Sequence, residues 1–259
     1  MLSKNQVKFI RSLHSRKGRE EHRLFLAEGS KSVLEVAASS YRVEQVLALE
    51  EWIREHGKEL SGSGITALPV DEGEMDRITA LATASPALAV VRMKAAPAAA
   101  PEAGRGLTLV LDDIQDPGNL GTIIRVADWF GIRRIVCSPG TVELWNPKVI
   151  QATMGSFTRV DVFYTGLAGF LQEARSHGPV YGTFLEGTNI YSEELAADGV
   201  IVIGNESRGI SEDAGTFVTN KITIPSYALD QKQGTRAESL NAAIATAVVC
   251  AEFRRRFHD

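Results

Sequence analysis

The sequence is poor in cysteine and has no long hydrophobic run. Its 259 residues include only Cys137 and Cys250. Both have aliphatic neighbours, so we expect buried thiols rather than a disulfide. The five histidines show no ligand spacing with either cysteine, which disfavours a metal site. No apolar run approaches the roughly 18 residues of a membrane span, and the N-terminus lacks the apolar core of a secretory signal. These absences predict a reduced, cytoplasmic protein with no membrane or metal partner.

Two nucleotide-binding signatures are missing as well. No G-x-G-x-x-G pattern follows a predicted strand, which disfavours a dinucleotide-dependent oxidoreductase. Gly204 and Gly209 have the glycine spacing of a phosphate loop, but Ile210 stands where that loop needs a lysine. Because the lysine charge is what holds the phosphates, we reject a nucleoside triphosphate loop here.

Acidic residues slightly outnumber basic ones overall, but the N-terminus is rich in basic residues. The net charge is −4, yet residues 1–31 hold eight Lys or Arg and three acids. A basic segment of this kind can meet phosphate groups, although a solvated helix face explains it equally well. The candidate RNA-contacting residues in this segment are Lys4, Lys8, Arg11, Arg16, Lys17, Arg19 and Arg23.

An Ala/Pro/Gly-rich stretch divides the chain in two. Residues 95–106 read AAPAAAPEAGRG and have no apolar periodicity, which indicates an interdomain linker. Residues 1–94 combine short apolar runs with helical patterns, so we expect a small α/β domain. Residues 107–259 alternate more regularly and form the second predicted domain.

The second domain is predicted to contain a parallel sheet covered by helices. Near-continuous apolar runs alternate with helical stripes, as in sheets that are buried on both faces. The predicted strands are 107–112, 134–137, 160–163, 180–184, 200–203 and 222–224. A last helix is expected at about 236–256. Ligands of such sheets bind at the carboxyl ends of the strands, so the loops there are the candidate sites.

The loop after the first of these strands leads into a predicted helix. Asn119 precedes the apolar stripe that begins at Leu120, which suits a helix N-cap. Arg125 lies about 140° around the helix from Leu120, away from the core. A surface ion pair with Asp128 is the simplest role for this arginine.

Two later strands also end in polar loops. Ser211 is the predicted N-cap after the strand at 200–203, with acids in the next turn. Thr235 and Glu238 have capping-box spacing before the last helix. Ser239 and Asn241 are then expected within the first two turns of that helix.

Together these three segments resemble the motifs of the SpoU (TrmH-type) methyltransferases of the SPOUT superfamily. The motifs here read LDDIQDPGNLGTIIRVADWFG, VIVIGNESRGIS and ITIP…RAESLNAAIATAV, in order over about residues 107–256. FLAEGSKSVLEV and SPALAVVR more weakly resemble the family's N-terminal substrate-binding domain, which is akin to a small ribosomal RNA-binding protein. The resemblance implies an α/β fold whose second domain carries a deep trefoil knot. Residues 226–236 stand as an apparent insertion.

The resemblance also implies a cofactor, a partner and a set of site residues. S-adenosyl-methionine would be the methyl donor, RNA the substrate and a second copy of the chain the partner in a homodimer. The motif positions imply that the cofactor-binding residues are Gly204, Glu206, Ile210, Ile224, Ser239 and Leu240. They imply that the catalytic residues are Asn119, Arg125, Glu206, Ser239 and Asn241.

The implied reaction is methylation of a ribose 2′-hydroxyl. That hydroxyl must lose its proton as it attacks, and it must be aligned with the methyl group. Arginine is a poor base at any accessible pH, so we expect Arg125 to hold a phosphate and stabilise the developing alkoxide. Ribosomal RNA is the favoured target over tRNA. The alternatives are a base methyltransferase of the same superfamily and a non-catalytic RNA-binding module.

Overall fold

The computed structural model describes residues 1–94, 106–227 and 239–257, which form two compact units. The first unit contains residues 1–94 together with Glu143–Thr158. The second contains the other described residues, 106–142 and 159 onward. The chain therefore leaves the second unit after Val142 and returns to it at Arg159. The predicted linker is therefore not the only point at which the chain passes from one unit to the other. Most of that linker lies outside the described residues.

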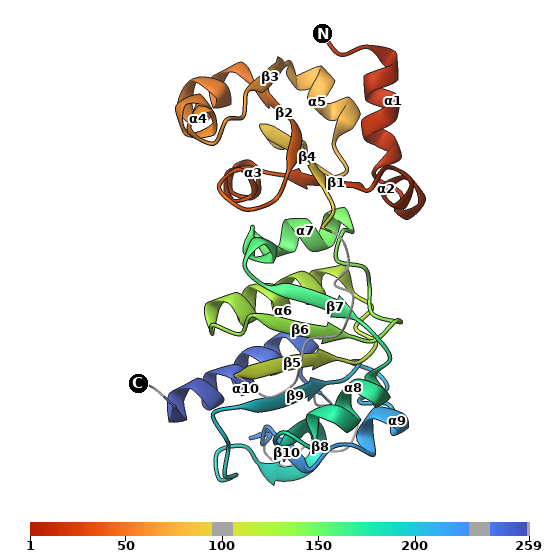
Figure 1. The fold of residues 1–259 in the computed structure, drawn as a ribbon, viewed down its shortest axis with the longest axis vertical. Coiled ribbons are helices and arrows are strands. Elements are labelled where there is room, and N and C mark those ends of the chain that lie inside the picture. Colours follow the sequence, from red (N-terminus) through yellow and green to blue (C-terminus); the bar gives the residue numbers. More distant parts are fainter. Residues whose placement is uncertain (95–105, 228–238, 258–259) are drawn as a thin grey trace. The chain divides into compact units, whose positions relative to one another are not determined.

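The first unit is built on a mixed four-stranded sheet (Figure 1). The strand order is β1-β4-β2-β3, with β4 antiparallel to β1 and β2, and β3 parallel to β2. Its strands are β1 (Leu24–Glu28), β2 (Val43–Leu49), β3 (Ala67–Val70) and β4 (Ala87–Arg92). Its helices are α1 (Lys4–Ser12), α2 (Arg16–His22), α3 (Ser30–Ala37), α4 (Glu50–Gly62), α5 (Glu72–Ile78) and α7 (Pro147–Thr153). The predicted small α/β domain is confirmed, although β3 was not foreseen.

The segment Glu143–Thr158 joins the first unit through an aromatic cluster. The Trp145 ring lies 4.5 Å from the Phe25 ring of β1, centroid to centroid. Phe157 packs edge-on against Phe25 and Tyr41. Aromatic pairs of this geometry stabilise by more than their buried area alone. The ammonium of Lys94 covers the Tyr41 ring at 4.2 Å.

The second unit contains the predicted parallel sheet. Its six strands have the order β10-β8-β9-β5-β6-β7, and every neighbouring pair is parallel. The strands are β5 (Leu107–Leu111), β6 (Arg134–Cys137), β7 (Asp161–Tyr164), β8 (Val180–Asn189), β9 (Gly199–Ile203) and β10 (Asn220–Thr223). Each of the six overlaps a predicted strand, although β8 extends five residues beyond the predicted 180–184.

Helices cover both faces of this sheet, as a parallel sheet requires. On one face α6 (Pro117–Trp129) packs against α10 (Ala242–Arg256). On the other, α8 (Leu167–Ala174) and α9 (Glu212–Gly215) pack over Val110, Val136 and Val202. Figure 1 shows these two helix pairs on opposite sides of the strands.

Both cysteines are buried and free, as predicted. Burial raises the pKa of the Cys137 thiol, and it raises the pKa of Cys250 to about 12. Thiols with a raised pKa form little thiolate and react slowly. Both side chains serve as small hydrophobic groups in the core.

Candidate functional site

The sheet of the second unit has a topological switch point between β5 and β9. From β5 the chain moves outward through α6 to β6 and then β7. From β9 it moves through α9 to β10, beyond β8 on the other side. The loops that leave the carboxyl ends of β5 and β9 therefore diverge, and such a point is where open α/β sheets bind ligands.

A chain of three polar side chains spans this point. The amide nitrogen of Asn119, near the start of α6, donates to the Glu206 carboxylate in the loop after β9. The Asn119 amide oxygen accepts a 2.9 Å hydrogen bond from the amide of Asn241. The Asn241 oxygen in turn caps α10 by accepting from the backbone of Ala243 and Ile244. Three residues that are distant in sequence are thus held together at one edge of the sheet.

The loop that carries Glu206 is folded tightly on itself. Backbone hydrogen bonds of 2.8 and 3.0 Å join Asn205 and Gly209 in both directions. Gly204 has no room for a side chain, because an added Cβ would lie 2.3 Å from the backbone of Gly209 and Ile210. Gly209 has φ +69°, which favours glycine. The two glycines are therefore explained by the tight shape of this loop, and not by a phosphate-binding role.

The residues that follow β5 hold this loop from the opposite side. The buried carboxylate of Asp112 accepts a 2.8 Å hydrogen bond from the backbone N–H of Ser211. The Asp113 carboxylate accepts from the Arg208 guanidinium, and the two form an ion pair. The loops after β5 and β9 are therefore joined at two positions that follow Glu206 in sequence.

Helix α6 begins earlier than predicted. Its N-cap is Asp116, whose carboxylate accepts a 2.8 Å hydrogen bond from the Asn119 N–H. Pro117 occupies the first helical position, where its missing N–H costs nothing. The N-cap role predicted for Asn119 is wrong, and its side chain is free to join the polar chain instead.

Arg125 lies on α6 with its side chain exposed to solvent. The expected ion pair with Asp128 does not form, because Asp128 pairs with Arg159 at 2.8 Å. Within the described residues, no hydrogen bond or ion pair engages the Arg125 guanidinium. Its charge is therefore available to a ligand.

The predicted cofactor residues come from the ends of β9 and β10 and the approach to α10. Ile210 and Ile224 are half-buried, and Leu240 is half exposed. The last helix starts at Ala242 with Asn241 as its N-cap. The prediction that Ser239 and Asn241 lie inside the helix is wrong, since both precede it. Thr235, Glu238 and most of the 226–236 insertion lie outside the described residues.

The basic residues of the first unit lie in two different environments. Lys4, Lys8, Lys17 and Arg23 are exposed, as are Arg11 and Arg16. Arg19 is only 2% exposed, and it donates to the carbonyl groups of Leu13 and His14 and pairs with Glu143. The prediction that Arg19 contacts RNA is therefore wrong, because its charge is used inside the unit.

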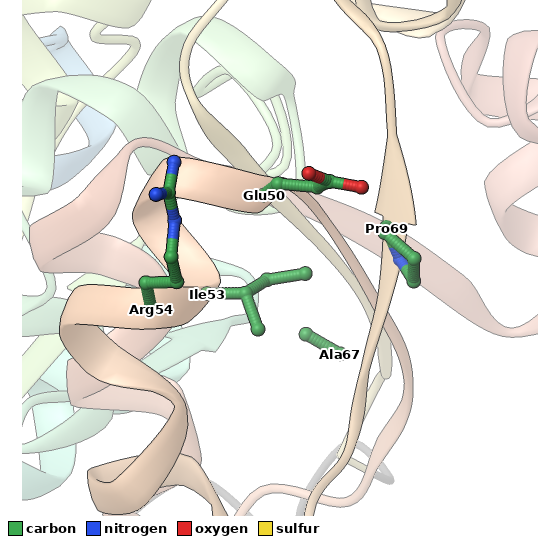
Figure 2. Close-up of a pocket in the computed structure, with 5 residues that line it drawn as sticks. All are labelled: Glu50, Ile53, Arg54, Ala67 and Pro69. Carbon is green, nitrogen blue, oxygen red and sulfur yellow. The ribbon is translucent and has the colours of Figure 1, made fainter.

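A shallow depression in the first unit lies between α4 and β3. It has a volume of about 270 Å³ and is lined by Glu50, Ile53, Arg54, Ala67 and Pro69. Figure 2 shows these side chains around an open space between the helix and the strand. They include none of the residues of the polar chain, so this hollow is not the candidate site.

Sequence reasoning missed several residues that build the site. Asp113, Asn205 and Arg208 hold the loop after β9, but none stood out by its pattern. The signal available for Asp116 was the Asp-Pro pair, which is typical of an N-cap followed by the first helical residue.

In the parts of the chain that the structure describes, no group of three metal-ligating side chains occurs, and no helix is long and apolar enough to cross a membrane.

Comparison with known proteins agrees with this geometry. The model of the SpoU rRNA Methylase family matches residues 106–251, which contain the whole polar chain. The MRM3-like substrate binding domain matches residues 4–89. The two matches fall on either side of the predicted linker.

The chain also resembles proteins over its full length. It is 31% identical to the 23S rRNA (guanosine(2553)-2′-O)-methyltransferase RlmP of Bacillus subtilis, with 97% of each chain covered. A putative RNA methyltransferase of the TrmH family from Porphyromonas gingivalis superposes with a TM-score of 0.83 and 39% identity, covering 99% of this chain and 100% of that one. An AdoMet-bound rRNA methyltransferase from Sinorhizobium meliloti gives 0.83 at 27% identity, covering 100% of this chain and 97% of that one.

The family match and the similarity to RNA methyltransferases over the full length identify this chain as an RNA methyltransferase, and the six-stranded parallel sheet agrees with that fold. The family model matches more than half of the chain, and the relative from Bacillus subtilis is similar over the full length, so the family can be assigned as well. The chain belongs to the SpoU rRNA methylase family.

Proposed function

We propose that this enzyme transfers a methyl group from S-adenosyl-methionine to a ribose 2′-hydroxyl of ribosomal RNA. The observation that carries the proposal is the hydrogen-bonded chain from Asn241 through Asn119 to Glu206. It brings together one residue from each of the three family motifs at the switch point. The relatives named for 2′-O-methylation of 23S rRNA support the ribose and the ribosomal target.

The candidate residues suit an adenosyl sulfonium ligand. Ile210, Ile224 and Leu240 offer apolar surface that is not fully buried, as an adenine ring needs. The Glu206 carboxylate supplies negative charge that complements a positive sulfonium. Gly204 and Ser239 complete the proposed cofactor set. When bound, S-adenosyl-methionine supplies the electrophilic methyl group.

Arg125 is proposed to act on the RNA rather than on the cofactor. Its guanidinium is exposed and has no partner within the described residues. Arginine keeps its proton, so it cannot take the proton of the hydroxyl. It can hold the phosphate beside the target ribose and stabilise negative charge on the attacking oxygen. Asn119, fixed between Glu206 and Asn241, keeps a defined orientation near the start of the same helix, six residues before Arg125.

The first unit is proposed to bind the RNA substrate. Lys4, Lys8 and Arg11 are spaced by four and three residues along α1, so they share one exposed face of this helix. Lys17 and Arg23 add positive charge nearby in sequence, as does Arg16, which also pairs with Glu20. Contacts from such residues position an RNA through its phosphates without reading its sequence.

We further propose that the enzyme works as a homodimer in the cytoplasm. Trp129 of α6 is 85% exposed, and about half of the surface of Leu240, just before α10, and of Ile244, in its first turn, is exposed. Exposed large apolar side chains on α6, on α10 and just before α10 suit an interface with a second copy. The family resemblance adds two proposals: a trefoil knot in the second unit, and kinship of the first unit with a small ribosomal RNA-binding protein.

Calorimetric titration with S-adenosyl-methionine tests the proposal against a purely RNA-binding role. We expect saturable binding of one cofactor per chain, and weaker binding by the Glu206→Gln variant. An absence of binding heat at several temperatures would support the RNA-binding module instead. Transfer of labelled methyl groups to ribosomal RNA and to tRNA in parallel then decides between the two targets.

A further inference from the structure

Asp113 holds an unusual position at the end of β5. Its φ of +61° lies in the left-handed region, which asparagine, aspartate and glycine tolerate best. Its backbone N–H donates a 2.9 Å hydrogen bond to the Ser138 hydroxyl, which follows β6. A Cβ added at Gly140 would come within 2.4 Å of the Asp113 carboxylate. The neighbouring strand end therefore fixes both the backbone and the carboxylate of this residue.

Asp113 is tied to the loop after β9 by two separate groups. The Asn205 amide donates a 2.8 Å hydrogen bond to the Asp113 carbonyl oxygen. The Arg208 guanidinium pairs with the Asp113 carboxylate. Asn205 and Arg208 flank Glu206 in sequence, so the bonds to Asp113 bracket the residue that Asn119 contacts.

The loop itself depends on the same residues. The amide oxygen of Asn205 accepts from the backbone N–H groups of Ser207 and Arg208 at 2.9 and 3.2 Å. The amide of Asn205 thus organises the turn with its oxygen and anchors it to Asp113 with its nitrogen. The loop that carries Glu206 is therefore anchored from outside by Asp113, through Asn205 and Arg208, in addition to the bond from Ser211 to Asp112.

We propose that Asp113 is a positioning residue for the methyl-transfer site, acting through Arg208 and Asn205 on the loop that carries Glu206. We call this set the Asp113 latch. In this role, the left-handed conformation of Asp113 and its ion pair with the exposed Arg208 both serve to hold the loop after β9. The consequence for catalysis rests on the proposed function, because it assumes that the loop holds the cofactor.

The latch predicts a specific pattern of effects. With the latch weakened, the loop samples other conformations and fewer molecules present Glu206 correctly, so the apparent affinity for S-adenosyl-methionine falls. Because the Arg208 side chain is 67% exposed, the expected loss is about twofold to fivefold, as for a solvent-screened ion pair. RNA affinity should not change, because Asp113 and Arg208 are not among the proposed RNA contacts.

Three variants weaken the latch in different ways, and a fourth is the control. Asp113→Asn keeps the left-handed conformation but removes the charge, and Arg208→Gln removes the other partner. Gly140→Ala leaves both partners in place but displaces the carboxylate. Asp128→Asn is the matched control, since it breaks the ion pair with Arg159 at the other end of α6.

Hydrogen–deuterium exchange of the free enzyme and calorimetry with S-adenosyl-methionine are the two measurements. We expect faster exchange in peptides covering 204–211 for the first three variants and wild-type exchange for the control. The double variant Asp113→Asn/Arg208→Gln should bind the cofactor no more weakly than either single variant, because the two residues act together.

Unchanged exchange at 204–211 in Asp113→Asn and Arg208→Gln would overturn the latch, whatever the cofactor does. Additive losses in the double variant would also overturn it. A wild-type enzyme that shows no cofactor binding would instead overturn the proposed function, while the exchange data would still decide the latch.

Discussion

The side-chain amide of Asn241 donates a 2.9 Å hydrogen bond to the side-chain oxygen of Asn119, which lies 122 residues earlier in the chain. The same Asn241 side chain caps α10 with its oxygen. The start of the last helix and the start of α6 are thus fixed relative to each other. Asn119 then has one orientation in which it can also donate to Glu206.

Asn241→Asp should separate helix capping from organisation of the site. Aspartate caps a helix as well as asparagine does, but it cannot donate to Asn119. We expect methyl transfer to fall at least tenfold, with the melting temperature within a few degrees of wild type. Asn241→Ala should lose both functions and cost about 1 kcal/mol of stability as well. Activity of Asn241→Asp close to wild type would show that the bond to Asn119 is dispensable.

Arg125→Lys and Arg125→Ala should slow the chemical step. Lysine keeps the charge but not the planar, two-pronged contact with phosphate. We expect losses of about 10-fold for lysine and 100-fold or more for alanine in single-turnover rate, since electrostatic groups of this kind contribute on this scale. Cofactor affinity, measured by calorimetry, should stay the same. A normal single-turnover rate for Arg125→Ala would exclude a catalytic role.

Gly204→Ala should disrupt the loop that carries Glu206. The added methyl group would meet the backbone of Gly209 and Ile210 at 2.3 Å. We expect a loss of about 1–3 kcal/mol in stability, typical of overpacking, and weaker binding of S-adenosyl-methionine. Gly215→Ala is the matched control, because an added Cβ there meets nothing within 4 Å. Equal cofactor affinity in both variants would contradict this account of the loop.

Glu252 should make the stability of the enzyme depend on pH in the acid range. Hydrogen bonds from Arg255, and then from Arg256, lower the pKa of this carboxyl from 4.5 to about 2. The stabilisation is therefore complete above pH 4.5 and is lost as the pH falls towards 2. Glu252→Gln should be less stable than wild type by about 1.5–3 kcal/mol at neutral pH. Urea unfolding should show this gap closing as the pH falls below 4.5; a constant gap would contradict the assignment.

The basic face of α1 should account for part of the salt dependence of RNA binding. Replacing Lys4, Lys8 and Arg11 with glutamine should weaken binding and lower the slope of log affinity against log salt by about one for each phosphate that is no longer neutralised. Lys58→Gln, an exposed site on α4, serves as the control. Arg19→Ala should behave differently, since it leaves Glu143 unpaired and should cost about 3–5 kcal/mol of stability. An unchanged slope in the triple variant would remove α1 from the RNA interface.

The elements of the second unit could be predicted because their signals are local. A strand such as Arg134–Cys137 is a short apolar run, and burial on both faces of a parallel sheet requires that pattern. In the first unit, β3 was missed because Leu68 and Pro69 are exposed and give no alternating pattern. The N-cap of α6 was placed three residues late, although Pro117 carried the correct signal.

The connections within the site could not be predicted in the same way. The Asp113–Arg208 ion pair joins residues 95 positions apart, and only the order of β5 and β9 in the sheet brings them together. The burial of Arg19 depends on Glu143, 124 residues later. Motif positions identified Asn119, Glu206 and Asn241 as candidates. Which of these side chains hydrogen-bonds to which depends on the fold and could not be read from the motifs.

Methyl transfer from labelled S-adenosyl-methionine to ribosomal RNA, followed by alkaline hydrolysis of the product, tests the central claim most directly. A 2′-O-methyl group blocks strand cleavage at its own phosphate, so we predict that the label appears in alkali-resistant dinucleotides, and that Asn119→Ala abolishes it. Label recovered in single nucleotides with a methylated base would contradict ribose methylation.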